Sequence, residues 1–182
     1  SDKYRPLYHF FRQNFSQVTN PPIDSLRENK VMSLKTRFGN LGNILDFDNL
    51  TEEHIYVLDS PILTNSQFKK FKKFFSKKVK VIDCTFDIKL SLKDRIEAIR
   101  EETETAVREG STTLILSDKN ISNHKASIPS ILTVGAVHSH LVKHGLRGYC
   151  SLNVECSDAL DTHSFAVLIG VGATTVNPYL AI

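Results

Sequence analysis

The amino-acid sequence predicts an α/β protein in which parallel β-α repeats follow a helical and loop extension. Two observations support this prediction. From residue 79 onward, short apolar runs of strand length alternate with longer segments whose apolar residues recur at helical spacing. The helical segments also carry capping residues and glycines at the places where helices start and stop. Such alternation is typical of a parallel sheet whose strands are joined by right-handed crossovers.

The first strand and helix of this region have the clearest signals. The run VKVIDCTF, residues 79–86, is β-branched and apolar, as expected of a strand. In the following SLKDRIEAIREETETAVREG, Ser91 and Asp94 give an N-terminal cap signal, and Gly110 stands where the helix should stop. The apolar residues of this helix share one face, which comprises Leu92, Ile96, Ile99, Thr103, Ala106 and Val107.

Three more strands are predicted in the same manner. They lie in STTLILSD (residues 111–118), YCSLNVEC (149–156) and TTVNPY (174–179). One predicted helix runs between Pro129 and Gly145, and another lies in THSFAVLIGVGA, residues 162–173. Residues 79–182 therefore form a predicted βαβαβαβ core.

Four such units form either a rudimentary half of a TIM-barrel-like sheet or a small doubly wound sheet, and periodicity does not separate the two. The strands at 111–117 and 148–155 are apolar enough to be buried on both faces. In either arrangement the carboxyl ends of the strands meet at one edge, where such folds usually bind ligands. The polar residues expected at this edge are Asp83, Thr85, Ser117, Asp118, Glu155 and Asn177.

Residues 1–78 form a predicted extension that packs on the core. Residues 6–17 have apolar side chains at helical spacing. A rigid turn follows at Asn20-Pro21-Pro22, because proline fixes its own φ and lacks an N–H. Ser25 with Glu28 resembles a capping box for a second helix, residues 37–54 have loop composition, and residues 55–63 look extended.

The composition is that of a soluble globular domain, with 41% hydrophobic and 24% charged residues among 182. No apolar run approaches the roughly 18 residues of a membrane span, and no signal-peptide pattern opens the chain. We therefore expect a cytoplasmic location and no membrane partner. Three cysteines are too few for a disulfide framework. The chain does not start with Met, so we expect it to be a piece of a longer polypeptide.

Seven lysines lie between Lys69 and Lys80, in a chain whose net charge is only +3. Lysines interleaved with phenylalanines would suit a nucleic-acid surface. However, Phe68, Phe71 and Phe75 fall at i, i+3 and i+7, which is the spacing of an amphipathic helix with solvated lysines. We favour the helix and predict no nucleic-acid partner; a nucleic-acid-binding module working through this segment is the weaker alternative.

No convincing catalytic set emerges from the residues. Ser117, Asp118 and Glu155 could do acid–base chemistry, but Ser and Asp at strand ends also cap the following helix. His140 and His144 stand one helical turn apart and could share a metal ion. His138 points away from them and no carboxylate stands at a metal-motif spacing, so no metal site is predicted. Gly170 and Gly172 end a helix, which favours a packed turn over a phosphate-binding loop.

Several longer motifs resemble a known family. The segments FSQVTNPPIDSLREN, LDSPILTN, LILSDK, IPSILTVGAVHSHLVKHGLR, NVE and FAVLIGVGATTVNPYLA occur in the order and spacing of the central domain of the glutamate synthase large subunit. The resemblance covers essentially the whole chain. It implies a domain similar to a rudimentary form of the FMN-binding barrel of those enzymes, which agrees with the half-barrel prediction.

The resemblance also implies a role within a larger enzyme. Glutamate synthases transfer the amide nitrogen of glutamine to 2-oxoglutarate, using an amidotransferase domain, an FMN-binding domain and an iron–sulfur cluster. The central domain is expected to be a non-catalytic scaffold that links the two active-site domains and helps to form the ammonia tunnel between them. FMN and the cluster are expected in the parent enzyme and not in this piece, which should be inactive alone. A small subunit or ferredoxin is an expected further partner.

The residues expected to contact other domains or the tunnel lie in two groups. The first group is the rigid turn, with Thr19, Asn20, Pro21, Pro22, Ile23 and Asp24. The second group lies at strand ends, with Ser117, Asp118, Asn177, Pro178 and Tyr179. The alternative is a free-standing α/β enzyme that binds a small ligand at the strand ends, through Asp83, Ser117, Asp118 and Glu155.

Overall fold

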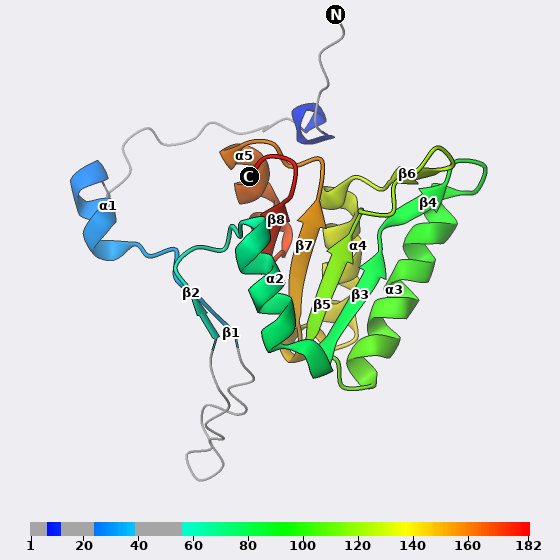
Figure 1. Ribbon diagram of the computed structural model, residues 1–182, viewed down its shortest axis with the longest axis horizontal. Coiled ribbons are helices and arrows are strands. Elements are labelled where there is room, and N and C mark those ends of the chain that lie inside the picture. Colours follow the sequence, from blue (N-terminus) through cyan, green and yellow to red (C-terminus); the bar gives the residue numbers. More distant parts are fainter. Residues whose placement is uncertain (1–6, 12–23, 39–55) are drawn as a thin grey trace, which may run out of the picture.

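A four-stranded parallel sheet forms the core of the computed structural model, which describes residues 7–11, 24–38 and 56–182 (Figure 1). The strands lie in the order β3-β5-β7-β8. Their bounds are Val79–Asp83 for β3, Thr113–Ser117 for β5, Ser151–Cys156 for β7 and Thr175–Pro178 for β8. The helices between them are α3 (Leu92–Arg108), α4 (Ser130–Lys143) and α5 (Thr162–Val171). The predicted repeats are therefore all present.

The order of the strands separates the two predicted arrangements. All three strand pairs are parallel and follow one another in chain order, whereas a doubly wound sheet reverses its order at a switch point. Ile99 of α3, Val134 of α4 and Leu168 of α5 all join the same core cluster as Leu114 and Val154 of the sheet. The three helices thus cover one face, called here the α3–α5 face. The α/β half-barrel-like fold is confirmed.

In the first turn of each crossover helix, one backbone N–H group donates a hydrogen bond to a side-chain oxygen. The Ser91 hydroxyl accepts a hydrogen bond from the Asp94 N–H at 3.3 Å, as the cap signal predicted. Asp161 accepts from the Ser164 N–H at 2.7 Å. Helix α4 begins after a proline, and its first N–H, that of Ser130, donates to Asp158 from the loop after β7. No helix among the described residues is long and apolar enough to cross a membrane.

The opposite face of the sheet is covered by α2 (Asn65–Phe74), and is called here the α2 face (Figure 1). Phe68 and Phe71 of this helix are buried against Ile115 of β5, which confirms the amphipathic helix. Thr64 and Gln67 close a capping box at its start, and a 3-10 turn, η3 (Ser76–Lys78), follows its end. Residues 61–63 run beside β8 and exchange backbone hydrogen bonds with Val176, so the last strand does not present an open edge.

The predicted strand over residues 79–86 is wrong in one respect, because it divides at Cys84. The Cys84 N–H donates to the Ser117 carbonyl at 2.8 Å, and the Cys84 carbonyl accepts from the Ile128 N–H at 2.9 Å. The chain therefore leaves the main sheet and forms β4 (Thr85–Asp87), which pairs antiparallel with β6 (Lys125–Ser127). Strand β6 has three residues and no strand-like pattern, which is why the sequence did not predict it.

The extension before the core is only partly described. Helix α1 (Ser25–Val31) is capped by Asp24, whose carboxylate accepts from the N–H groups of Leu26 and Arg27. The predicted capping box from Ser25 is therefore wrong, because the cap residue is Asp24 and Ser25 is the first residue of the helix. Strand β1 (Thr36–Phe38) pairs antiparallel with β2 (Tyr56–Leu58), so the start of the predicted loop is a strand.

Two further predictions concern the extension. In the segment 6–17 the structure describes residues 7–11, with a 3-10 turn, η1 (Leu7–Phe10). The predicted turn at Thr19, Asn20, Pro21, Pro22 and Ile23 lies outside the described residues. The division of the chain at residue 78 stays a prediction.

Candidate functional site at the carboxyl edge of the sheet

The four core strands end at the same edge, the upper edge in Figure 1. Register places Ser117 of β5 beside Glu155 of β7, and Glu155 beside Asn177 of β8. Neighbours in register point to the same side of a sheet, so these three polar side chains lie on the α2 face at its carboxyl edge. The structure thus brings together the residues that the strand ends predicted.

Glu155 is the centre of this edge. Its side chain is almost completely buried, yet both of its oxygens have partners. The Ser117 hydroxyl donates to Oε2 at 2.7 Å, and the Lys119 ammonium lies 2.7 Å from Oε1. A buried carboxylate is stable only when it is paired and hydrogen-bonded, and this one is. Lys119, just after the predicted Ser117-Asp118 pair, was not predicted, because nothing in its local pattern shows that it reaches across to another strand.

Asp118 ties the loop after β5 to the loop after β7. Its Oδ2 accepts from the hydroxyl and the N–H of Ser157, at 2.6 and 2.8 Å. Its other oxygen, Oδ1, is buried and accepts no hydrogen bond from the described residues. Burial, together with the Asp118 carboxylate, raises the pKa of the Tyr179 phenol to about 12. The Lys119 ammonium lies 4.9 Å from the centre of the same ring. Tyr179 is therefore a neutral group held beside a carboxylate.

Asn177 and Pro178 connect the last strand to the start of α2. The Asn177 amide donates to the Leu63 carbonyl at 2.9 Å and to the Asn65 side chain at 3.1 Å. Pro178 is buried, and its carbonyl accepts from the N–H groups of Ala181 and Ile182. These two predicted contact residues thus have structural partners within the described part of the chain.

Asp83 lies at the end of β3. Although burial favours the neutral acid, hydrogen bonds from Thr85 and the nearby Lys125 ammonium hold the pKa of Asp83 below its usual value. The Thr85 hydroxyl donates to Oδ1 at 2.7 Å, and the Arg95 guanidinium donates to the carbonyls of Asp83 and Thr85. This carboxylate therefore serves mainly to fix the turn between β3 and β4.

The polar character extends down the α2 face. The Thr175 hydroxyl donates to the side-chain oxygen Oδ1 of Asn153 at 2.7 Å, and the side-chain amide of Asn153 donates to the backbone carbonyl of Leu114 and to the Ser151 hydroxyl. Asn153 and Thr175 are both completely buried. The prediction that β5 and β7 are buried on both faces is confirmed, but one of those faces is largely polar. The alternation of polar and apolar residues in SLNVEC, residues 151–156, is the sequence signal that could have predicted this polar face.

One cavity at this edge is small. Its volume is about 10 Å³, and it is lined by side chains that include Cys84, Asp118, Ser130, Glu155 and Cys156. A volume of roughly 10 to 15 Å³ is what one water molecule needs. This cavity therefore has room for a molecule of that size, and not for a nucleotide or a sugar phosphate.

The described residues do not fit an iron–sulfur cluster or a flavin phosphate. Burial raises the pKa of the Cys84, Cys150 and Cys156 thiols, whereas a cluster is bound by thiolates. Gly172 has φ +132° at the end of α5, and a Cβ there would lie 2.5 Å from the His138 ring. Gly172 therefore forms a tightly packed turn, as predicted, whereas Gly170 lies within α5 and has open space beside it. His140 and His144 lie at the far end of α4, away from the carboxyl edge.

Comparison with known proteins shows a full-length match. The family model described as "Glutamate synthase central domain" matches residues 1–182. The chain is 57% identical to the large chain of the NADPH glutamate synthase of Azospirillum brasilense, and 40% identical to the chloroplastic ferredoxin-dependent glutamate synthase of Spinacia oleracea. It is 41% identical to the NADH glutamate synthase of Schizosaccharomyces pombe. In each case all of this chain is covered, but it spans only 12%, 12% and 9% of these relatives.

Proposed function

Since the chain belongs to the glutamate synthase central domain family, we propose that it is the non-catalytic central scaffold of a glutamate synthase. In this proposal it links a glutamine amidotransferase domain to an FMN-binding synthase domain of the same polypeptide and contributes to the wall of an ammonia tunnel. The parent enzyme makes glutamate from glutamine and 2-oxoglutarate. Its electrons come through a small subunit or from ferredoxin, in keeping with the names of the relatives.

The observation that carries this proposal is the closed carboxyl edge. In a barrel enzyme, the strand ends present free side chains to a substrate. Here Glu155 is engaged by Ser117 and Lys119, and Asp118 is engaged by Ser157. These contacts join β5 to β7 and their loops, and the cavity beside them is no larger than a water molecule needs. A rigid platform is the role that such an edge supports.

The loops of the same edge carry exposed apolar side chains. Ile121 follows β5, Leu160 follows β7 and Leu180 follows β8, and they are 47%, 52% and 69% exposed. Apolar side chains exposed together at one edge are typical of a surface that contacts another protein or domain. We therefore place the contact with the neighbouring domains at these loops. The segment Thr19–Asp24 and the half-buried Tyr179 ring are further contact candidates.

The proposal is tested in the full-length enzyme that carries this domain. Leu160→Lys and Leu180→Lys place a charge at the carboxyl edge, while Val142→Lys does so at a similarly exposed position near the opposite end of α4. For each enzyme, the glutamine hydrolysed is compared with the glutamate formed from 2-oxoglutarate. We expect excess glutamine hydrolysis in the two edge variants and wild-type coupling in Val142→Lys.

If both edge variants keep the wild-type ratio of glutamine hydrolysed to glutamate formed, the proposed domain contact at these loops is wrong. The segment Thr19–Asp24 is tested separately with Asn20→Ala and Pro21→Ala, by the same ratio. If both of these variants keep the wild-type ratio, this segment is not part of the tunnel or of the domain contact.

A further inference from the structure

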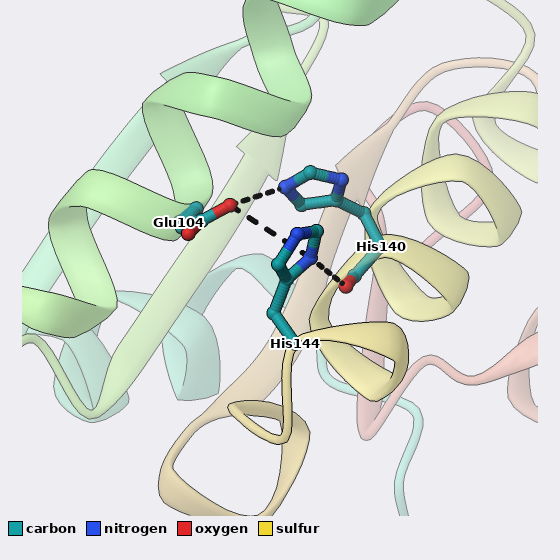
Figure 2. Close-up of side chains that lie close together, drawn as sticks. All are labelled: Glu104, His140 and His144. Atoms are coloured by element: carbon teal, nitrogen blue, oxygen red, sulfur yellow. Dashed lines mark hydrogen bonds and ion pairs between the residues drawn. The ribbon is translucent and has the colours of Figure 1, made fainter.

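We propose that Glu104, His140 and His144 form a binding site for one divalent transition-metal ion of the zinc class, which joins α3 to α4 (Figure 2). The site lies near the carboxyl ends of the two helices, away from the polar groups at the carboxyl edge of the sheet, and its two histidines belong to the motif IPSILTVGAVHSHLVKHGLR. It does not depend on the proposed role in ammonia transfer.

The fold brings the three side chains together. His140 lies in the last turn of α4 and His144 caps it, so the two rings stand one helical turn apart on one side of the helix. Helix α3 packs beside α4, and Glu104 lies in its last turns. Figure 2 shows the Glu104 carboxylate pointing at both rings. The carboxylate that the sequence lacked at a motif spacing is thus supplied by the preceding helix.

The distances suit a metal ion after small side-chain rotations. Glu104 Oε2 lies 2.7 Å from His140 Nε2 and 3.8 Å from His144 Nδ1, and one ligand atom from each residue falls within 4.8 Å of the others. In a tetrahedral site with bonds of about 2.0 to 2.1 Å, ligand atoms are about 3.3 Å apart. The observed separations lie on both sides of this value, so no movement of the helix backbones is needed.

Neighbouring groups prepare two of the ligands. Arg108 donates to Glu104 Oε1 at 2.9 Å, which orients the carboxylate and leaves Oε2 directed at the histidines. Hydrogen bonds from Arg108 and His140 also hold the pKa of Glu104 below its usual value, so the group is ionised. The contact of His144 Nδ1 with the His140 carbonyl, at 2.8 Å, holds this ring beside the other two ligands, and Nδ1 gives up that contact when it binds the ion.

The ligand types select the metal. Two imidazoles and one carboxylate suit Zn²⁺ and its first-row neighbours, whereas Mg²⁺ and Ca²⁺ prefer oxygen ligands throughout. The side chains of Glu104, His140 and His144 are 22%, 18% and 35% exposed, so solvent can reach the ion and a water molecule can take the fourth position. Binding requires neutral imidazoles, and the proton shared between His140 and Glu104 leaves to solvent when the ion enters.

The competing interpretation is an interhelical hydrogen bond between His140 and Glu104 with no metal function. The two interpretations differ over His144. Its ring centroid lies 4.3 Å from that of His140, and its Nδ1 lies 3.8 Å from Glu104 Oε2. A metal site needs His144 as a ligand. The simple His140–Glu104 pair does not need it.

The test is a calorimetric titration of the folded protein with ZnCl₂ at neutral pH, with folding of every variant verified by circular dichroism. We expect one high-affinity ion per chain, a rise in Tm on adding Zn²⁺, and no rise with Mg²⁺. Glu104→Gln and His144→Gln should each weaken this binding at least about tenfold, by comparison with losses on altering metal-site partners. His124→Gln, at an exposed histidine in the loop before β6, is the matched control and should bind Zn²⁺ like the wild type.

Two results overturn the proposal: no stoichiometric Zn²⁺ binding by the wild type, or binding that both Glu104→Gln and His144→Gln leave unchanged. His144 lies at the exposed end of its helix, so this variant tests the proposal even if a substitution within α3 prevents folding.

Discussion

Both faces of the parallel sheet are largely covered, but by different chemistry. On the α3–α5 face, the strands present Ile82, Leu114, Leu116, Leu152, Val154 and Val176. On the α2 face, the same strands present Thr113, Ser117, Asn153, Glu155, Thr175 and Asn177, with Ile115 as the apolar exception among the fully buried positions. The first face is stabilised by packed volume, and the second by hydrogen bonds that must be satisfied one by one.

This difference shows how a half-barrel can remain closed. In a complete barrel, the face opposite the helices is filled by side chains from the remaining strands. Here α2 covers it with Phe68 and Phe71, and the polar side chains beneath pair with one another and with backbone carbonyls. A face that binds its own polar groups has few left for a substrate, which fits a scaffold.

The largest effect is expected on the α3–α5 face. Leu152→Ala removes a completely buried side chain from the middle of β7 and leaves a cavity. We expect the free energy of unfolding to fall by about 3 kcal/mol. Urea unfolding followed by circular dichroism measures it. Val142→Ala, at a position 54% exposed on α4, is the control and should change stability by less than about 0.5 kcal/mol.

A smaller but more diagnostic effect is expected on the α2 face. Thr175→Val keeps the shape of the side chain but leaves the buried Asn153 oxygen without its donor, and should cost about 2 kcal/mol. Adding Asn153→Leu removes the unpaired oxygen, so the double variant should lose less stability than the sum of the two single variants. Additive losses in the urea midpoints would show that this pair is not a coupled polar contact.

The carboxyl edge should be less sensitive still. Glu155→Gln keeps the size of the side chain and can still bond to Ser117, but it removes the charged partner of Lys119. Because the Lys119 side chain is 49% exposed, we expect a loss of only about 1 kcal/mol. A neutral result together with a destabilising Ser117→Ala would indicate that the hydroxyl contact, and not the lysine, holds this edge together.

Local patterns predicted the elements well and the contacts between them poorly. Ser91 and Gly110 mark the ends of α3, and the spacing of Phe68 and Phe71 identified α2, because each signal lies within a few residues. The Asp158 cap of α4 comes from 28 residues away, so no local pattern shows it.

The same limit applies to the sites. Glu104 reaches His140 across 36 residues, and Lys119 reaches Glu155 across another 36. The strand ends did predict that Ser117 and Glu155 meet, since register follows from the parallel order of the strands. They did not show that these residues bond to each other and not to a ligand.

A polar cluster around Arg147 lies on the α3–α5 side near the amino ends of the strands, and it leads to the smallest expected effect. Arg147 donates to the carbonyls of Cys150 and Gly172 and to Nδ1 of His138, the last at 3.2 Å. Burial and the Arg147 charge lower the pKa of His138. The folded protein therefore disfavours protonated His138 while the unfolded chain accepts the proton, so this contribution to stability is present above the ordinary histidine pKa of about 6.5 and is lost as pH falls through the lower folded value.

We expect stability to decrease as the pH falls below about 6.5, in the interval before the carboxylates with lowered pKa values, Asp83 and Glu104, take up protons. His138→Phe keeps a ring packed against Gly172 but cannot be protonated, so the decrease over this interval should be shallower than in the wild type. Urea midpoints measured at steps across the interval test this, and His124→Gln controls for the loss of an exposed histidine. Parallel pH profiles for wild type and His138→Phe would mean that the guanidinium is tolerated beside the ring in either protonation state.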